Sequence, residues 1–351
     1  MKKISKLLVG ILFSALVISP SYAGEMSVTG SAKASYVTNG SDGSGGKNVG
    51  VANELDFTAN GELDNGFTWK YQVQLDDAGA GNDDTRLEIG TDMGTLGFYI
   101  SEGGLRNQLA HGIGALGTGY DYASTSTFQA GYNVDGYANV QYHTPADMLP
   151  LGAQIKVGYV PNMNNTAGTS FKGAVSNPGT QAEGRDMQQV AISMSPLDGL
   201  TIKGDAAEVN AHQSVNTTGD DGVSANLGAK YTMGQFSVGY TEGGYQPATG
   251  LTADDETVYY ENKYYGIQFD LNDAVSLSYN VDESEKNTRA AVATAATAGT
   301  KTIVAMEQET FQLAYTIGGA TIGIADIDTT NADYTAGKEE AMTVVSLVVD
   351  F

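Results

Sequence analysis

Few side chains of this sequence suit covalent or metal chemistry. Cysteine is absent, and the only histidines are His111, His143 and His212. The zinc motif His-Glu-x-x-His, a nucleophile elbow and a glycine-rich phosphate loop between a strand and a helix are all missing. His143 has two interpretations, a catalytic histidine or one more polar residue in line with Asn139 and Gln141, and the second is favoured. We therefore expect no enzyme and no metal centre.

Fixed charges offer a different chemistry, the electrostatic sorting of small charged solutes. Several acids lie on or at the ends of one long segment, residues 103–135, and bases lie at its start and at alternating positions of the segments before it. Opposed charges across a narrow passage filter ions and polar solutes. Taken singly, each of these residues could equally be an ordinary solvated charge. The acids are Glu102, Asp121 and Asp135, and the bases are Lys33, Lys70, Arg86 and Arg106.

The chain as a whole is strongly acidic. It carries 18 basic and 41 acidic residues, a formal charge of −23 that becomes −26 without residues 1–23, which hold three lysines and no acids. Such a charge argues against a nucleic-acid partner and favours cations. The stretch 39–46 and the acidic runs 220–221 and 254–256 hint at calcium, but no nine-residue repeat follows. We expect no cofactor, with a divalent cation bridging such loops to acidic lipid headgroups as the open alternative.

The first 23 residues have the pattern of a cleaved secretory signal. A lysine-rich start precedes an apolar run of about 12 residues, Leu7–Ile18, and the small residues Ser21 and Ala23 precede a cut at Gly24. A spanning helix needs about 20 apolar residues, and no later stretch of the chain comes near that length. Two exported fates remain, a soluble secreted protein and a transmembrane barrel, each with residues 24–351 as a single domain.

The elements that must position the charges are β-strands. Apolar and polar residues alternate with period two in segments of about 9 to 12 residues, as in a membrane β-barrel. In residues 53–63, Leu55 and Phe57 share one face while Glu54 and Asp56 share the other. The alternation predicts sixteen antiparallel strands, at residues 26–37, 50–62, 66–77, 84–92, 94–102, 136–144, 152–160, 186–195, 199–209, 222–232, 235–245, 256–271, 274–283, 304–317, 320–329 and 340–351.

The predicted connections alternate between short turns and long polar loops, as the two ends of an up-and-down barrel require. An even strand number lets the last strand pair with the first, so that no sheet edge faces lipid. The longest connection, residues 103–135, would have room to fold inside a barrel of this size. Residues 126–134 could also form an extra strand, but a loop is preferred because that strand would make the number odd.

Two further patterns are more specific than alternation. At the C-terminus, apolar residues at every second position lead up to a terminal aromatic residue: Val345, Leu347, Val349 and Phe351. After the long connection, Tyr137–Pro145, a short turn and Gly152–Tyr159 form a hairpin pattern.

With these features the mature chain, from Met26 onward, resembles the sixteen-stranded general diffusion porins of Gram-negative outer membranes, particularly the alpha-proteobacterial type. The resemblance implies a homotrimer in the outer membrane, in contact with lipid and lipopolysaccharide. It also implies that the third loop, residues 103–135, folds into each pore, where its acids face bases on the wall. The terminal strand ending in Phe351 looks like the signal read by the barrel assembly machinery. Many relatives carry Pro-Glu-Phe-Gly on that loop, and this chain lacks it.

Three functions are compatible with these patterns. The favoured one is a water-filled channel for passive diffusion of small hydrophilic solutes and ions, with a preference for cations because acids outnumber bases. A substrate-specific channel, for a sugar or another small solute, would need aromatic residues along the lumen, yet the rows with Phe57, Phe67, Trp69 and Tyr71 are expected to face outward. A secreted β-rich adhesin would need a second sheet to cover those rows.

Overall fold

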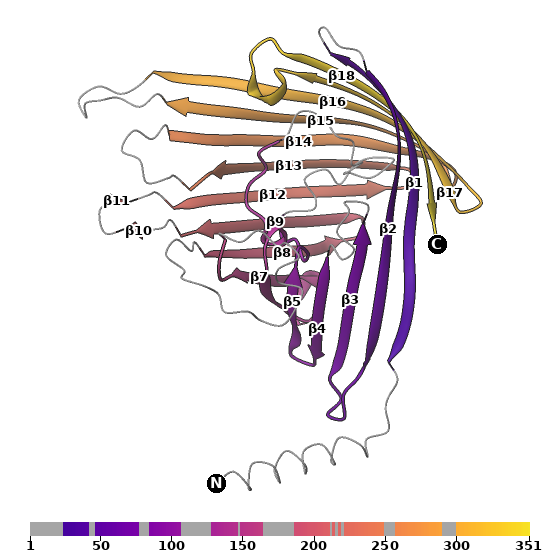
Figure 1. The fold of residues 1–351 in the computed structure, drawn as a ribbon, viewed down its shortest axis with the longest axis vertical. Helices are drawn as coiled ribbons and strands as arrows, with labels where there is room; N and C mark the ends of the chain where they lie inside the picture. Colours follow the sequence, from indigo (N-terminus) through magenta and orange to yellow (C-terminus); the bar gives the residue numbers. More distant parts are fainter. Residues whose placement is uncertain are drawn as a thin grey trace, which may run out of the picture.

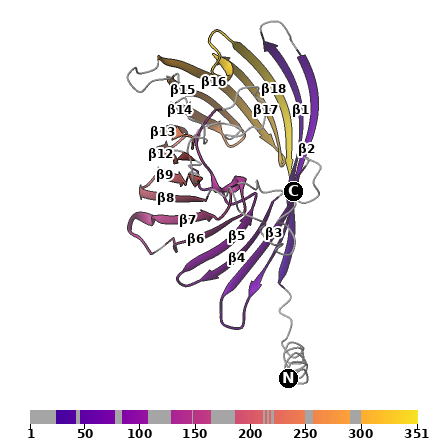
Figure 2. The ribbon, with the colours of Figure 1, turned by 60° about the vertical axis from the view of Figure 1, so that its left-hand side comes forward.

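The chain forms one closed antiparallel β-barrel. In the computed structural model sixteen strands pair edge to edge, and β18 pairs with β1 to close the sheet. Figures 1 and 2 show this wall from two directions, with neighbouring strands following one another in chain order. The expected signal segment, residues 1–23, lies outside the described residues. The structure describes residues 24–41, 46–76, 84–106, 128–146, 148–163, 186–210, 213–214, 217–218, 221–248, 257–289 and 300–351.

The barrel strands vary in length from 5 residues in β6 to 17 residues in β1, β2 and β16. They are β1 (Glu25–Ser41), β2 (Gly46–Glu62), β3 (Thr68–Asp76), β4 (Thr85–Thr91), β5 (Gly94–Ile100), β6 (Asn139–His143), β7 (Gln154–Val160), β8 (Met187–Leu197), β9 (Leu200–Val209), β12 (Gly222–Met233), β13 (Phe236–Gln246), β14 (Thr257–Asn272), β15 (Val275–Arg289), β16 (Lys301–Ile317), β17 (Ala320–Thr330) and β18 (Glu339–Asp350). A separate two-stranded ribbon consists of β10 (Gln213–Ser214) and β11 (Thr217–Thr218). Among the described residues no helix is long and apolar enough to cross a membrane.

The two faces of the wall differ in polarity. On β14, Ile267 is 45 % exposed on the outer face, whereas Asn262 on the inner face is buried. Val238 and Leu347 repeat the outer pattern, and Gln312 repeats the inner one. Successive side chains of a strand point to opposite faces, so the alternation in the sequence becomes an apolar exterior and a polar interior. Short turns join the strands, and their glycines adopt positive φ, as at Gly66 (82°) and Gly234 (61°).

The seam between the first and last strands is continuous. Ser31 lies opposite Asp350 in the register of β1 and β18. Beyond that pair, Gly30 and Phe351 exchange two backbone hydrogen bonds, of 2.8 and 2.9 Å between nitrogen and oxygen. The side chains of the expected assembly signal, Val345, Leu347, Val349 and Phe351, are all exposed.

The expected number of barrel strands is confirmed, and several boundaries are corrected. Two strands begin later in the sequence than expected, because a 3₁₀ turn precedes each of them. The turn η1 (Val134–Gly136) precedes β6, which begins at 139 and not at 136, and η2 (Pro150–Gly152) precedes β7, which begins at 154 and not at 152. Conversely, β15 continues six residues past its expected end at 283, and β16 begins three residues before 304. The ribbon β10–β11 lies in a connection that was expected to be loop throughout. The residues added to β15, 284–289, and those of the ribbon are polar on both faces, so no apolar alternation marks them in the sequence.

Candidate functional site

Both described ends of the long connection lie against the inner wall. The backbone N–H of Val134 donates to Gln189 Oε1 on β8 (3.0 Å), and Asn262 Nδ2 on β14 donates to the carbonyl oxygen of Gln129 (3.1 Å). Residues 128–133 form no strand, which agrees with the preference for a loop over an extra strand. Figure 2 shows this stretch along the concave side of the wall. Asp121 lies outside the described residues.

An apolar cluster inside the barrel holds these loop ends in place. Leu105 and Val134 from the connection pack with Val160, Met187 and Val209 from the wall, and each is at most 4 % exposed. These contacts account for the apolar alternation near Val134, since its side chain faces the wall and not lipid. Burying such side chains removes apolar surface from water and so fixes both loop ends on β7, β8 and β9.

Two of the expected constriction residues form an ion pair. Arg86 Nη1 on β4 lies 2.8 Å from Glu102 Oε1, just beyond the end of β5. The guanidinium also donates to Gln72 Oε1, and Gln72 Nε2 donates to Asp56 Oδ1 at 2.9 Å. Burial raises the pKa of Glu102, and the positive charge of Arg86 opposes that rise. The pair is thus part of a polar row across the inner faces of β2, β3 and β4.

Lys70 belongs to the same group. It lies opposite Glu88 in the register of β3 and β4, and its charge also acts to lower the pKa of Glu102. Tyr99 donates its hydroxyl to Glu88 Oε1 at 2.8 Å. Acids and bases therefore alternate at this part of the wall, with Lys70 and Arg86 close to Glu88 and Glu102.

A second group gathers around the loop. Asn133 Nδ2 donates to Asp135 Oδ2 at 2.5 Å, and Arg106 Nη1 donates to the carbonyl oxygen of Gly131 at 2.9 Å. Burial raises the pKa of Asp135, and the charge of Arg106 opposes the rise. Asp135 and Arg106 are thus brought together from opposite ends of the connection.

Lys33 stands apart from the other candidates. On β2 its partner is Ala52, whereas the row of Arg86 and Gln72 meets β2 at Thr58. Six residues of strand separate these rows, a distance of about 20 Å. The alternation of residues predicts the face on which Lys33 lies but gives no information about its position along the strand relative to the other bases.

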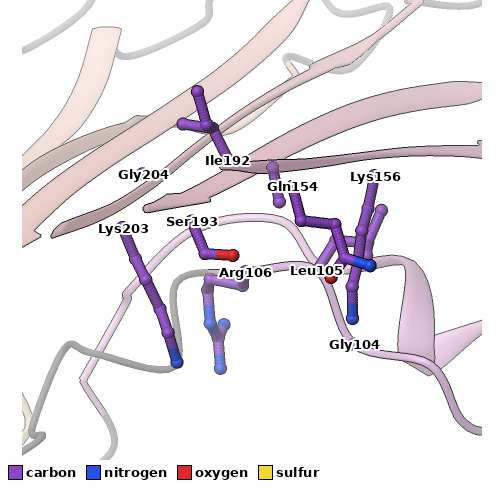
Figure 3. Close-up of a pocket in the computed structure, with 10 residues that line it drawn as sticks. Gly104, Leu105, Arg106, Gln154, Lys156, Ile192, Ser193, Lys203 and Gly204 are labelled. Atoms are coloured by element: carbon purple, nitrogen blue, oxygen red, sulfur yellow. The ribbon is translucent and has the colours of Figure 1, made fainter. Parts of the chain in front are cut away.

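Lysines that were not among the candidates line the wall on the other side of the loop. Lys156 on β7 and Lys203 on β9 line a cavity of about 250 Å³ together with Arg106. Figure 3 shows these three side chains projecting to the same side of the wall, while Ile192 projects to the other. Both lysines occupy inward positions in the alternating segments 152–160 and 199–209, which is the sequence signal that marks them.

An adjoining recess has mixed charge. It has a volume of about 430 Å³, and Glu88, Glu102, Asp135 and His143 are among its lining residues, with Lys156 shared between the two cavities. His143 Nε2 lies 2.8 Å from Gln141 Oε1, in agreement with its expected place in a polar wall. The described residues contain no group of three or more His, Cys, Asp or Glu placed to hold a metal ion. The acidic run 254–256 lies outside them.

A row of tyrosines on the inner face was not identified from the sequence. Tyr132 meets Tyr245 at 5.1 Å between ring centroids, Tyr245 stacks on Tyr260 at 5.6 Å, and Tyr260 meets Tyr334 at 5.3 Å. The Tyr334 hydroxyl accepts from the N–H of Gln129 at 3.1 Å. Tyr334 belongs to η4 (Ala332–Tyr334), so this row joins two separate connections to the wall. The outer rows with Phe67 and Tyr71 are exposed as expected.

Comparison with solved structures shows a similar fold in outer-membrane proteins. No protein-family model and no curated protein sequence match the chain. Among solved structures, a loop-deletion mutant of OmpT, an outer-membrane protein of Vibrio cholerae, has a TM-score of 0.65 and 12% identity over 93% of this chain and 99% of that one. The same protein in a trimer form gives 0.63 and 11% over 93% and 99%. An anion-selective porin from Comamonas acidovorans gives 0.59 and 12% over 93% and 100%. At such identities the likeness concerns the fold, and the chain has the closed antiparallel barrel fold of outer-membrane porins.

Proposed function

We propose that the chain is an outer-membrane porin of a Gram-negative bacterium, a water-filled channel through which small hydrophilic solutes and ions diffuse passively. The observation that carries the proposal is the two-faced closed wall, with Ile267 and Leu347 outside and Asn262 and Gln312 inside. Lipid accepts the outer side chains, and water solvates the inner ones. In this proposal residues 1–23 are removed during export, and residues 24–351 form the barrel.

The long connection, residues 103–135, is proposed to narrow the channel. Its two described ends are anchored on the inner wall through Leu105 and Val134, and Asp135 lines the same recess as the pair of Arg86 and Glu102. Where a channel is narrow, fixed charges of both signs orient the dipoles of polar solutes and select ions by the sign of their charge. Asp121, farther along the loop, is proposed to add to the acidic side.

The channel is proposed to prefer cations moderately. The chain has 41 acids against 18 bases before signal removal, so the potential along the passage is negative on balance and raises the local cation concentration. The basic side chains Arg106, Lys156 and Lys203 act against this preference locally, which keeps it moderate.

The proposed assembly is a homotrimer. It is supported by the likeness to OmpT, one of whose structures is described as a trimer form. Lipid and lipopolysaccharide are the proposed surroundings, and the exposed terminal row ending in Phe351 is the proposed contact for the assembly machinery. Divalent cations between acidic loops and lipid headgroups remain part of the proposal as a secondary feature.

Planar-bilayer recording tests the central proposal. The mature chain, refolded in detergent and added to a bilayer, should produce discrete conductance steps, and a potassium chloride gradient should give a reversal potential of the sign expected for cation preference. Barrel protein that inserts without conducting would overturn the channel, and clear chloride preference would overturn the selectivity alone.

A substrate-specific channel is the second candidate, and the inner tyrosine row favours it. Tyr132, Tyr245, Tyr260 and Tyr334 offer aromatic surface and hydroxyl groups to a solute inside the barrel. Currents that saturate with, and are blocked by, one neutral sugar would favour this candidate, whereas currents insensitive to sugars would favour general diffusion.

A further inference from the structure

We infer that the cavity lined by Arg106, Lys156 and Lys203 binds an anionic oxygen group, a carboxylate or a phosphate, of a solute inside the barrel. The inference deepens the proposed channel function and rests on it. In a chain of net charge −23, such a cavity gives anionic solutes one favourable position on a path that otherwise repels them.

The three bases come from three separate parts of the structure. Lys156 lies on β7, Lys203 lies two strands away on β9, and Arg106 lies at the start of the long connection. Their side chains project to the same side of the wall (Figure 3), into a cavity of about 250 Å³. A volume of this size accommodates a phosphate or a small carboxylate together with water. Ser193 also lines the cavity and can donate a hydroxyl hydrogen bond to an anion.

The cavity itself is lined by basic charges, whereas the acids Glu88, Glu102 and Asp135 line the adjoining recess, which shares Lys156 with it. None of the described residues that line the cavity is acidic. In the described part of the chain the ion pairs join Arg86 to Glu102 and Lys338 to Asp333 and Glu340, and none involves Lys156 or Lys203. An anion bound between the lysines would relieve their mutual repulsion.

Two acids in this part of the barrel accept hydrogen bonds from other side chains. Asp205, on the same strand as Lys203, is 6 % exposed and accepts hydrogen bonds from Gln189 and Asn226. Asp135 attracts Arg106 but accepts a hydrogen bond from Asn133 and lines the adjoining recess. Arg106 is therefore shared between the recesses, and the two lysines define the anion position.

Block of single-channel current tests the inference on the full mature chain. Inorganic phosphate and acetate, added in separate arms at constant ionic strength, should each reduce the current of open channels in a saturable way at millimolar concentration. Glycerol, which is neutral, should not. The anion with the lower half-blocking concentration identifies the preferred group.

Matched variants locate the site. Lys203→Gln should raise the half-blocking concentration about fivefold, since one of two fixed charges is lost. Lys286→Gln removes one lysine from β15, where Lys286 lies opposite Tyr260 of the inner row, and should leave that concentration unchanged. Absence of block in the unmodified protein, or equal effects of the two variants, would overturn the inference.

A measurement that needs no conduction separates this inference from the channel proposal. A ligand that binds only the folded state raises the unfolding temperature. Phosphate or acetate should therefore stabilise the detergent-folded protein and have a smaller effect on Lys203→Gln. If the protein never conducts but shows this difference, the anion site stands and the channel proposal fails. If it conducts and neither anion stabilises or blocks, the anion site fails alone.

Discussion

Arg86 Nη1 lies 2.8 Å from Glu102 Oε1, and the two side chains are only 22% and 19% exposed. The pair joins the wall to the start of the long connection. Because both groups are largely covered, salt screens their interaction less than it would screen an exposed surface pair. The pair therefore holds Glu102, at the start of the long connection, against β4.

Replacing Glu102 by Gln should shift the channel toward anions. The substitution removes the negative partner and leaves the Arg86 charge uncompensated at the wall, so the potassium-to-chloride permeability ratio should fall by about twofold. Reversal potentials in a potassium chloride gradient measure this ratio. Asp328→Asn is the matched control, since Asp328 is exposed on β17 beside the outward row. Equal shifts in the two variants would contradict a local role for the pair.

Cation preference should weaken at mildly acidic pH. Burial raises the pKa of Glu102 and of Asp135, so both lose their charge above the pH of about 4 at which ordinary carboxyls protonate. For the same reason both lower the free energy of unfolding at neutral pH, and this cost disappears as the pH falls through their raised pKa values. Reversal potentials recorded against pH should show an early change that Glu102→Gln/Asp135→Asn lacks. An identical pH profile in that double variant would exclude these two groups as its source.

Tyr334→Phe should weaken the attachment of the loop. The variant leaves the N–H of Gln129 without its acceptor and removes the contact with Ser284 Oγ at 2.8 Å. Leaving a covered donor unsatisfied costs about 1–3 kcal/mol of unfolding free energy. Urea unfolding in lipid vesicles, followed by fluorescence, measures the change. Tyr259→Phe, whose hydroxyl accepts from the exposed Lys301 at 3.2 Å, should cost much less.

Neighbouring residues on β14 should respond oppositely to a positive charge. Ile267→Arg places the charge among the exposed apolar side chains of the outer face and should cost about 2–4 kcal/mol if that level lies at the bilayer midplane. Gln268→Arg places it on the inner face, where water solvates it, and should cost little. The same vesicle unfolding experiment compares them. A similar loss in both variants would argue against lipid outside and water inside.

Phe351→Ala should affect assembly more than stability. The Phe351 side chain is 62% exposed, and its backbone bonds to Gly30 do not need the ring. The unfolding free energy of refolded protein should therefore change by less than about 1 kcal/mol. Accumulation in the outer membrane of cells should fall severalfold if the terminal aromatic residue is read during assembly. Leu271→Ala, at another exposed outer position, is the control that should accumulate normally.

The sequence predicts the barrel well because alternation is a local property of each strand. Leu55 and Phe57 against Glu54 and Asp56 define two faces without reference to any neighbour. The end of β15 was missed because Glu283 and Glu285 occupy outward positions where apolar residues were required. Strands that extend beyond the apolar belt lose that signal, so their ends cannot be predicted from it.

The site was less predictable because it depends on register. Arg86 and Glu102 could be assigned to the inner face and to the loop end, but their contact depends on how β4 and β5 pair. Lys33 has the same pattern as Lys70 and yet lies at another level of the wall. The grouping of Lys156 with Lys203 spans three strands, and the tyrosine row spans two strands and two loops. Such contacts are fixed by the whole sheet.

The two-faced wall also limits how this gene product can change in length. One residue inserted within a strand would move every following side chain of that strand to the opposite face, placing Asn262 toward lipid and its outward neighbours toward water. Two inserted residues would restore the facing and only lengthen the strand. Insertions of an even number of residues therefore preserve the two faces of the wall, and insertions of an odd number do not.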